Sequence, residues 1–310
     1  VLGAILSLLG GFAPAREHLE QGIALYDPKQ HHALAFLYGL DPGVVCLSRV
    51  AGVWWQLGYP DQALKRSRAA LTLAQELAHT HSLAFALSSA SMHHLHRREW
   101  RVSQERAEAL IALSREQGFA HFLTLGTIMR GGALIMQGQE EEGITQLRQV
   151  LAAERASVSA GRRVLVLMLL AEAQGKVGQA EEGLALLAEA LAVADKLRPY
   201  EAEMYRLKGE LTLKQSEVRG PRSEVDNPQS AFHNPQLDAE ACFLKAIEVA
   251  RRQQAKSLEL RATVSLARLW QRQGKTTAAQ QMLAEIYGWF TEGFDTADLQ
   301  EAKALLEELA

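Results

Sequence analysis

The sequence has 310 residues, is 48% hydrophobic and carries a formal net charge of -3 at pH 7. This length allows one large or two ordinary globular domains, and the composition excludes both a disordered chain and one that binds nucleic acid through bulk charge. Ala, Leu, Glu, Gln and Arg are abundant and β-branched residues are sparse, which predicts an all-helical protein.

Cys46 and Cys242 are the two cysteines and have no CxxC partner, so neither a disulfide framework nor a zinc knuckle is predicted. This usage fits a cytoplasmic location. The apolar opening Val1 to Leu9 lacks a basic leader and is too short to span a bilayer. We interpret it as the end of a helix and expect the chain to be a fragment of a longer protein. No membrane or nucleic-acid partner is expected.

The first predicted hairpin is partial and covers residues 1–27. Gly10-Gly11 is its turn, and its second helix runs from Ala15 to Tyr26. About eight residues are then inserted around Lys29 to Pro42, relative to the later spacing. The Pro, Gly and Asp residues at the end of this insertion, with a His pair inside it, predict a loop.

A repeat pattern is clearest in the stretch Trp54 to Leu73, where a Leu57-Gly58 turn separates two helical runs. Gly suits such a turn because helices commonly end on a left-handed residue. A small residue opens the second helix and recurs at intervals of 40 residues, interrupted once, at Ala63, Ser103, Gly143, Gly183, Ala239 and Ala279. A fixed period of this length predicts a repeat architecture.

A core position follows each small residue at a spacing of four, and a closely packed position and a hydrophobic one follow at seven and eight. These spacings put one stripe on one face of the second helix. The predicted core positions at spacing four include Leu147, Leu187, Phe243 and Leu283.

The spacing predicts six full hairpins over residues 43–80, 83–120, 123–160, 163–198, 200–254 and 257–290. One interval is longer than the others, and its excess falls in a Pro-rich, weakly apolar segment, residues 217–237, which predicts a mobile loop. A final helix over residues 296–309, with Thr296 as its N-cap, is expected to cover the last apolar face.

This pattern of small and large residues resembles the tetratricopeptide repeat (TPR), although the standard unit has 34 residues and the terminal Pro of the motif is mostly missing. HEAT-type repeats have a similar period but lack the Gly-then-Ala signature and rank second. The resemblance implies an all-α, TPR-like α-α superhelix. It would be a right-handed solenoid of helical hairpins with a C-terminal capping helix, forming a single domain over residues 1–310.

Three local runs resemble a narrower group, the C-terminal repeat region of bacterial class III adenylate/guanylate cyclase–AAA ATPase signalling proteins. They are residues 16–28, 57–63 and 286–296. The same type of tail occurs behind ATPases in LuxR-like transcription regulators. The resemblance implies a non-catalytic regulatory or sensor module in signal transduction. Its partner would be a protein or peptide, including the parent ATPase domain, and the alternative is a ligand-sensing tail of a LuxR-like regulator.

The sequence has no recognisable pattern of catalytic residues, and it predicts no cofactor and no metal site. Gly274-Lys275-Thr276 copies the end of a P-loop, but Leu269 stands where its first Gly is needed and no strand precedes it. His93, His94 and His96 splay over more than one helix face, unlike an i, i+4 metal pair, and are interpreted as solvated or groove-lining. An enzyme with an unrecognised site is the least favoured function.

In TPR arrays the first helix of each hairpin lines the concave surface, so its positions outside the core can be projected from the repeat register. In the first half these groove candidates are adaptable and largely apolar: Trp55, Gln56, Phe85, Met92, His96, Met129 and Met136. In the second half they are charged, with Glu172, Glu203 and Glu210 among Lys176, Lys214, Arg206, Arg261, Arg268 and Arg272.

The four Arg residues are the favoured binding group, because Arg forks suit the carboxylates of a partner. The alternative stays open that the apolar candidates are core residues and the Arg side chains are ordinary solvated surface.

Overall fold

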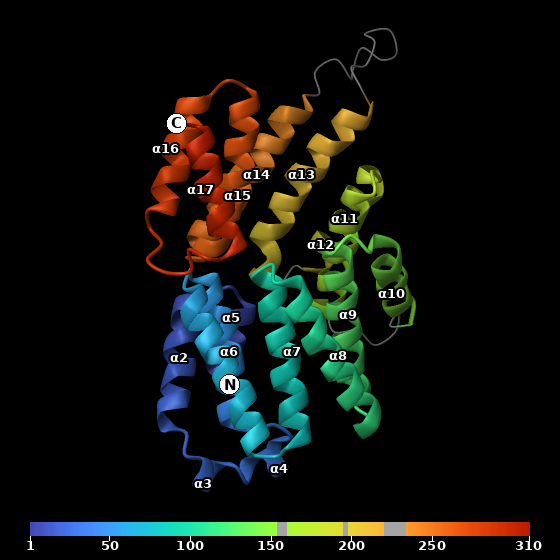
Figure 1. Ribbon diagram of the computed structural model, residues 1–310, viewed down its shortest axis with the longest axis vertical. Helices are drawn as coiled ribbons and strands as arrows, with labels where there is room; N and C mark the ends of the chain where they lie inside the picture. The colour runs from blue at the N-terminus through green and yellow to red at the C-terminus, as the bar shows by residue number, and fades with distance from the viewer. Residues whose placement is uncertain (154–159, 195–197, 220–233) are drawn as a thin grey trace. The chain divides into compact units, whose positions relative to one another are not determined.

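A computed structural model of the chain describes residues 1–153, 160–194, 198–219 and 234–310, and these form helices without a β-strand (Figure 1). Most helices pair into antiparallel hairpins. Their bounds are α1 Leu2–Leu8, α2 Phe12–Leu25, α3 Pro28–His31, α4 Leu34–Tyr38, α5 Pro42–Gln56, α6 Pro60–Glu76, α7 Thr80–His96, α8 Trp100–Gln117, α9 Ala120–Met136, α10 Glu140–Ala153, α11 Ala160–Lys176, α12 Ala180–Val193, a 3-10 turn η1 Arg198–Tyr200, α13 Glu201–Arg219, α14 Pro235–Arg252, α15 Lys256–Arg272, α16 Thr276–Tyr287 and α17 Ala297–Glu308.

The turns inside the hairpins have the predicted left-handed residue. Gly58 has φ of 90°, and the amide of Tyr59 after it donates to the Trp54 carbonyl oxygen at 2.9 Å, which closes the end of α5. Gly138, Gly178 and Gly274 have the same conformation, and Arg98 adopts it with φ of 62°. The turn prediction is therefore confirmed, with a strained Arg in one copy.

The small residues that mark the repeat are buried where two helices approach closely. A Cβ added to Gly143 would lie 2.6 Å from the Gly131 carbonyl oxygen, so α9 and α10 can meet at this distance only without a side chain. The other markers are also buried: Ala63, Ser103, Gly183, Ala239 and Ala279. The repeat register predicted from the sequence is confirmed by this burial.

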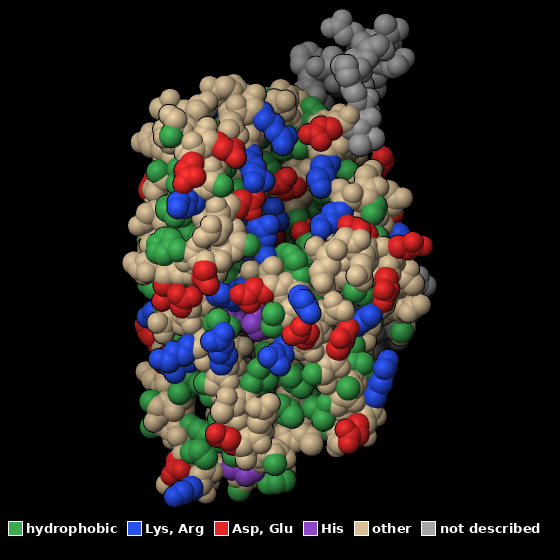
Figure 2. All heavy atoms as spheres, in the orientation of Figure 1, with side chains coloured by type: hydrophobic (Ala, Val, Ile, Leu, Met, Phe, Trp, Pro, Cys, Tyr) green, Lys and Arg blue, Asp and Glu red, His purple; other side chains and the backbone are tan. Residues whose placement is uncertain are grey.

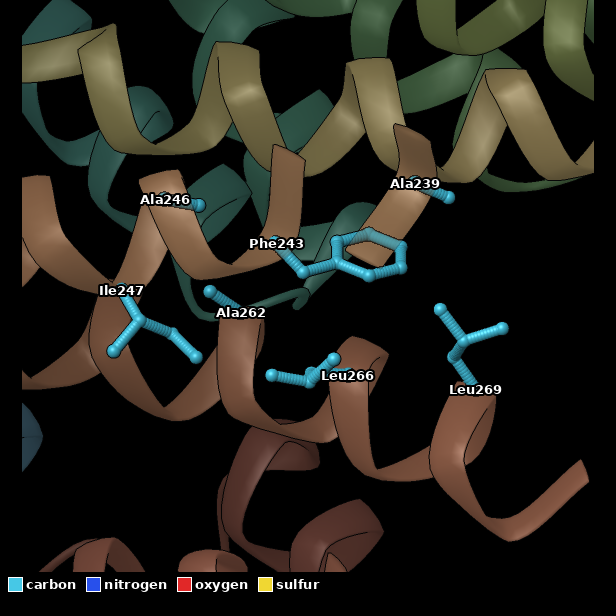
Figure 3. Close-up of a cluster of buried hydrophobic side chains, with 7 residues drawn as sticks. All are labelled: Ala239, Phe243, Ala246, Ile247, Ala262, Leu266 and Leu269. Carbon is cyan, nitrogen blue, oxygen red and sulfur yellow. The ribbon is translucent and has the colours of Figure 1, made fainter. Parts of the chain in front are cut away.

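The predicted large core residues are buried as well, and Phe243 shows how the register works. Its ring lies between α14 and α15, packed with Ala246, Ala262 and Leu266 (Figure 3). On the other side α13 comes close, because a Cβ on Gly209 would lie only 2.5 Å from the ring. Burying a Phe side chain of this size stabilises the fold by about 1.5–3 kcal/mol.

The insertion between the first two hairpins differs from the predicted loop, because it holds the short helices α3 and α4. A local cap explains α3, whereas α4 begins after Ala33 without a capping side chain. Asp27 accepts a hydrogen bond from the Lys29 amide at 2.9 Å, with Pro28 in the first turn, and Asp41 does the same for Val44 at the start of α5 at 3.0 Å. Capping side chains beside Pro residues begin helices here.

The second insertion was predicted as a loop over residues 217–237, and its two ends are helical. α13 continues to Arg219, and α14 begins at Pro235, where a missing amide hydrogen costs nothing. The remainder of that predicted loop, residues 220–233, lies outside the described residues.

The chain divides into two compact units. The first unit comprises Val1–Ser157 with the short segments Gln253–Ser257 and Phe290–Gln300, and the second unit comprises Val158–Arg252, Leu258–Trp289 and Glu301–Ala310. A single solenoid domain over the whole chain stays a prediction. The final helix lies where it was expected, and its residues Leu299, Leu305 and Leu309 are buried.

Among the described residues, no helix combines the length and the apolar character needed to cross a membrane.

Candidate functional site

The three neighbouring histidines of α7 point to different surroundings. His93 is buried, His94 lies 2.5 Å from a carboxylate oxygen of Glu99, and the His96 ring stacks on Trp55 with centroids 4.5 Å apart. In the part of the chain that the structure describes, no group of three His, Cys, Asp or Glu residues is arranged to hold a metal ion. The expectation that all three histidines are solvated or line a groove is wrong for His93.

Lys275, in the P-loop-like run, is engaged within the fold. It follows the Gly274 turn between α15 and α16, and its ammonium lies 3.3 Å from Glu240 and over the Trp270 ring. Gly274 and Lys275 therefore form a hairpin turn that an ion pair stabilises, and the resemblance to a P-loop is explained by this turn.

The apolar groove candidates lie in the first unit, and three of them are covered. Trp55, Gln56 and Met129 expose 3%, 6% and 1% of their surface. The other four are half-buried: Phe85, Met92, His96 and Met136. Trp55 also has a partner far along the chain, since the hydroxyl of Ser257, in the first turn of α15, donates to its carbonyl oxygen at 2.6 Å.

Core packing is therefore the better interpretation for Trp55, Gln56 and Met129, because a partner could reach them only after a change in structure. A binding role for the seven residues stays a prediction.

The charged groove candidates lie in the second unit on three successive first helices, α11, α13 and α15. We call this set the charged face: Glu172, Lys176, Glu203, Arg206, Glu210, Lys214, Arg261, Arg268 and Arg272. Figure 2 shows basic and acidic side chains gathered around a hollow over α13 and α15. The sequence register thus placed these residues on neighbouring helices of one unit.

Arg206 is the centre of the charged face and is held mainly from its own helix. Its guanidinium makes a two-pronged contact with Glu203, at 2.9 Å and 2.7 Å, and lies 3.6 Å from Glu210. Ser265 of α15 donates to the same Glu210 at 2.6 Å and so ties the two helices together. Such a paired geometry fixes a guanidinium more firmly than a single contact does.

The outer two Arg residues have carboxylate partners that the repeat register did not reveal. Arg268 pairs with Glu301 of α17 at 2.7 Å, and Arg272 pairs with Glu217 near the end of α13 at 3.3 Å. About half of the Arg268 side chain stays exposed. The predicted basic group is thus a mixed-charge network. Glu301 was missed because it lies in the capping helix, which does not follow the repeat.

Burial changes the acid–base behaviour of two groups of the charged face. Burial raises the pKa of Glu172, and the nearby Arg206 only partly opposes this effect. Burial alone would lower the pKa of Arg206, but Glu203, Glu210 and Glu172 outweigh it and hold that pKa above its ordinary value. Charges kept partly out of water are costly, so a cluster of them marks a functional candidate.

No protein-family model matches the chain, and no curated protein matches it. Among solved structures, a monomeric mutant of IFIT1 with Gppp-AAAA matches with a TM-score of 0.50 and 14% identity, over 98% of this chain and 70% of that chain. A STAND protein with a tetratricopeptide repeat sensor from Pyrococcus horikoshii matches with a TM-score of 0.46 and 15% identity, over 99% of this chain and 42% of that chain.

A kinesin light chain structure from Podosopora anserina, described as having nearly identical TPR-like repeats, matches with a TM-score of 0.44 and 16% identity, over 66% of this chain and 92% of that chain. At 14% identity, the match with a TM-score of 0.50 shows a shared fold alone. The fold class is all-α and TPR-like, as predicted from the sequence. The resemblance to cyclase–ATPase proteins stays a prediction.

Proposed function

We propose that this chain is a non-catalytic binding module that holds a protein or peptide segment on the charged face of its second unit. The observation that carries the proposal is the network around Arg206, which ties α13 to α15, together with the hollow over these helices at which basic and acidic side chains gather (Figure 2). A helical array needs no such network for stability, because buried charges are generally replaceable by apolar residues.

The outer Arg residues supply the capacity to bind. A guanidinium has five N–H donors, and one carboxylate uses at most two of them. Arg268 and Arg272 each pair with one carboxylate at exposed positions, where an ion pair contributes only about 0–1 kcal/mol. A partner carboxylate can therefore replace Glu217 or Glu301 at little cost. The expected ligand is an acidic segment.

The wider role is that of a regulatory or sensor module in a bacterial signalling protein of the cyclase–ATPase type, with the parent ATPase domain as the first partner to test. The support for this role is the resemblance of residues 16–28, 57–63 and 286–296 to such proteins. A cytoplasmic location accords with the free thiols Cys46 and Cys242. The second candidate is the ligand-sensing tail of a LuxR-like regulator, and the domain encoded next to this chain in its gene discriminates between the two.

The test is charge reversal at the exposed edge of the charged face. The variant Arg268→Glu with Arg272→Glu should weaken binding to the parent ATPase domain, and to acidic helical peptides, by at least about tenfold, a loss of about 1.4 kcal/mol. Isothermal titration calorimetry at two salt concentrations measures the affinity. The matched control is Arg101→Glu with Arg106→Glu, two exposed Arg residues of the first unit. If wild type and the Arg268/Arg272 variant bound with equal affinity, the charged face would be excluded as the binding site.

A further inference from the structure

The first turn of α6 has a helix cap that comes from the far end of the chain. α6 begins at Pro60 with no capping bond from the side chain of its own N-cap residue, Tyr59. One carboxylate oxygen of Glu292 instead accepts hydrogen bonds from the amides of Asp61 at 2.9 Å and Gln62 at 3.0 Å. The positive end of the helix dipole thus faces a carboxylate from 230 residues away.

The contact is reciprocal and requires glycine. The amide of Gly293 donates to a carboxylate oxygen of Asp61 at 3.1 Å. Gly293 has φ of 75°, and an added Cβ would lie 2.0 Å from Cγ of Pro60. The Thr296 hydroxyl, which donates to the Gly293 carbonyl oxygen at 2.7 Å, holds the loop in this shape. Glu292 therefore complements the charge of the first turn of α6, and Gly293 leaves room for Pro60.

A second anchor lies in the turn between α7 and α8. Arg98 reaches Asp298 at 3.4 Å, although its backbone has the left-handed φ of 62° that glycine adopts in the equivalent turns. Next to it, the buried Arg97 donates to the Pro60 carbonyl oxygen at 3.0 Å and so fixes the start of α6 against α7. Two consecutive hairpins of the first unit thus hold the loop.

We propose that the segment Phe290–Asp298 is a reversible clasp that closes onto the hairpins α5–α6 and α7–α8 and opens without unfolding either of them. The Glu292 contacts are polar and exposed, whereas the hairpins are held by their own buried residues, among them Val53, Ala63 and Ser103. Opening exchanges these hydrogen bonds for bonds to water and exposes the buried Phe290 side chain, which is a smaller apolar surface than unfolding a hairpin core would expose. The clasp belongs to the first unit, so it stands independently of the binding role proposed for the second.

The first experiment is hydrogen exchange on the full chain, followed by mass spectrometry of peptides that span the first turn of α6. In wild type, protection of the Asp61 and Gln62 amides should disappear at a denaturant concentration well below that which exposes α7 and α9. The variant Glu292→Ala should exchange there about tenfold faster, as expected for the loss of a helix cap, with unchanged exchange in α9. The matched control is Glu285→Ala, an exposed carboxylate of α16. If these amides lost protection only at the denaturant concentration that also exposes the hairpins, the proposal would be overturned.

The second experiment asks whether the clasp surface can accept the segment in trans. A fluorescent peptide with the sequence of residues 290–299 is added to wild type and to the double variant Glu292→Ala with Asp298→Ala. Fluorescence anisotropy should show binding to the double variant and at least about tenfold weaker binding to wild type, whose surface is occupied. Binding to neither protein would overturn reversible closure. Adding Asp61→Ala to the double variant should remove peptide binding, and binding that persists would also overturn it.

Discussion

His93 lies in the core of the first unit with both ring nitrogens lacking a hydrogen-bond partner among the described residues. Burial, assisted by His94 and Arg97, lowers its pKa to about 3. The ring is therefore neutral at physiological pH, with one N–H donor and one acceptor left unsatisfied. An unsatisfied buried polar group costs about 1–3 kcal/mol, so His93 weakens the core.

The first prediction concerns His93 and pH. In the unfolded chain the pKa of a histidine is near 6.5, so below this pH the unfolded state takes up a proton that the folded state excludes until about pH 3. The free energy of unfolding should then fall with decreasing pH, by up to about 1.4 kcal/mol per pH unit from this residue. In the variant His93→Leu this loss should disappear, as urea denaturation at pH 6.5 and pH 5 would show.

Between pH 6.5 and 5 the stability change caused by His93 can be measured without a contribution from Glu99. Hydrogen bonds from His94 and Arg97 outweigh burial and lower the pKa of Glu99 to about 2, so its contribution to stability is lost only as the pH falls from about 4.5 to about 2. The matched control is His18→Leu, an exposed histidine. An equal pH dependence in His93→Leu and wild type would contradict the prediction.

The repeat register held the information that would have placed His93 correctly. Forty residues before and after it stand Val53 and Ala133, and both are buried. The histidines were instead interpreted by residue type, which favours solvent. The carboxylate partners of the charged face are different, because Glu217 and Glu301 lie outside the repeat and no periodicity points to them.

At the scale of single helices, glycine acts in two opposite ways. Gly209 in α13 is needed, because an added Cβ would lie 2.5 Å from the Phe243 ring. Gly52 in α5 faces open space, with no atom within 4 Å of an added Cβ. The same substitution should therefore have opposite effects in these two helices.

The variant Gly209→Ala should lower the free energy of unfolding by about 1–3 kcal/mol, because the core must shift to admit the methyl group. The variant Gly52→Ala should raise it by about 0.5–1 kcal/mol, because alanine favours a helix interior. Chemical denaturation measures both, and each variant is the control for the other. Destabilisation by Gly52→Ala would show that α5 is more crowded than the structure indicates.

The helices most accurately predicted are those whose ends follow the repeat, since a Gly turn and a small marker residue fix both the end of one helix and the start of the next. The short helix α3 was missed because capping by Asp27, with Pro28 in the first turn, is a local effect without periodicity, and α4 has no capping side chain to indicate it. The residues of the charged face lie on first helices of hairpins, as the register predicted, but their charge balance depends on contacts between residues far apart in the sequence. Such contacts are invisible to a pattern of spacings.

At the scale of the molecule, the division into two units predicts that damage to one core stays within its unit. The variant Phe243→Ala should cost about 3–5 kcal/mol in the second unit, because it leaves a cavity between α14 and α15. Hydrogen exchange should then rise in α13, α14 and α15 but change little in α7 and α9, since repeat arrays are stabilised mainly by neighbouring contacts.

The matched control for Phe243→Ala is Leu244→Ala, the adjacent and exposed residue of the same helix. An equal rise in exchange throughout the chain would show that the two units unfold as one, contrary to the expected independence.

The cap that α6 receives from Glu292 also has a consequence for biosynthesis. The ribosome makes Asp61 and Gln62 about 230 residues before Glu292, which at typical elongation rates is a delay on the order of ten seconds or more. During this interval the nascent α6 has no carboxylate at its first turn, and the early hairpins must persist on their own packing. Completion of the first unit therefore waits until the segment around Glu292 has been translated.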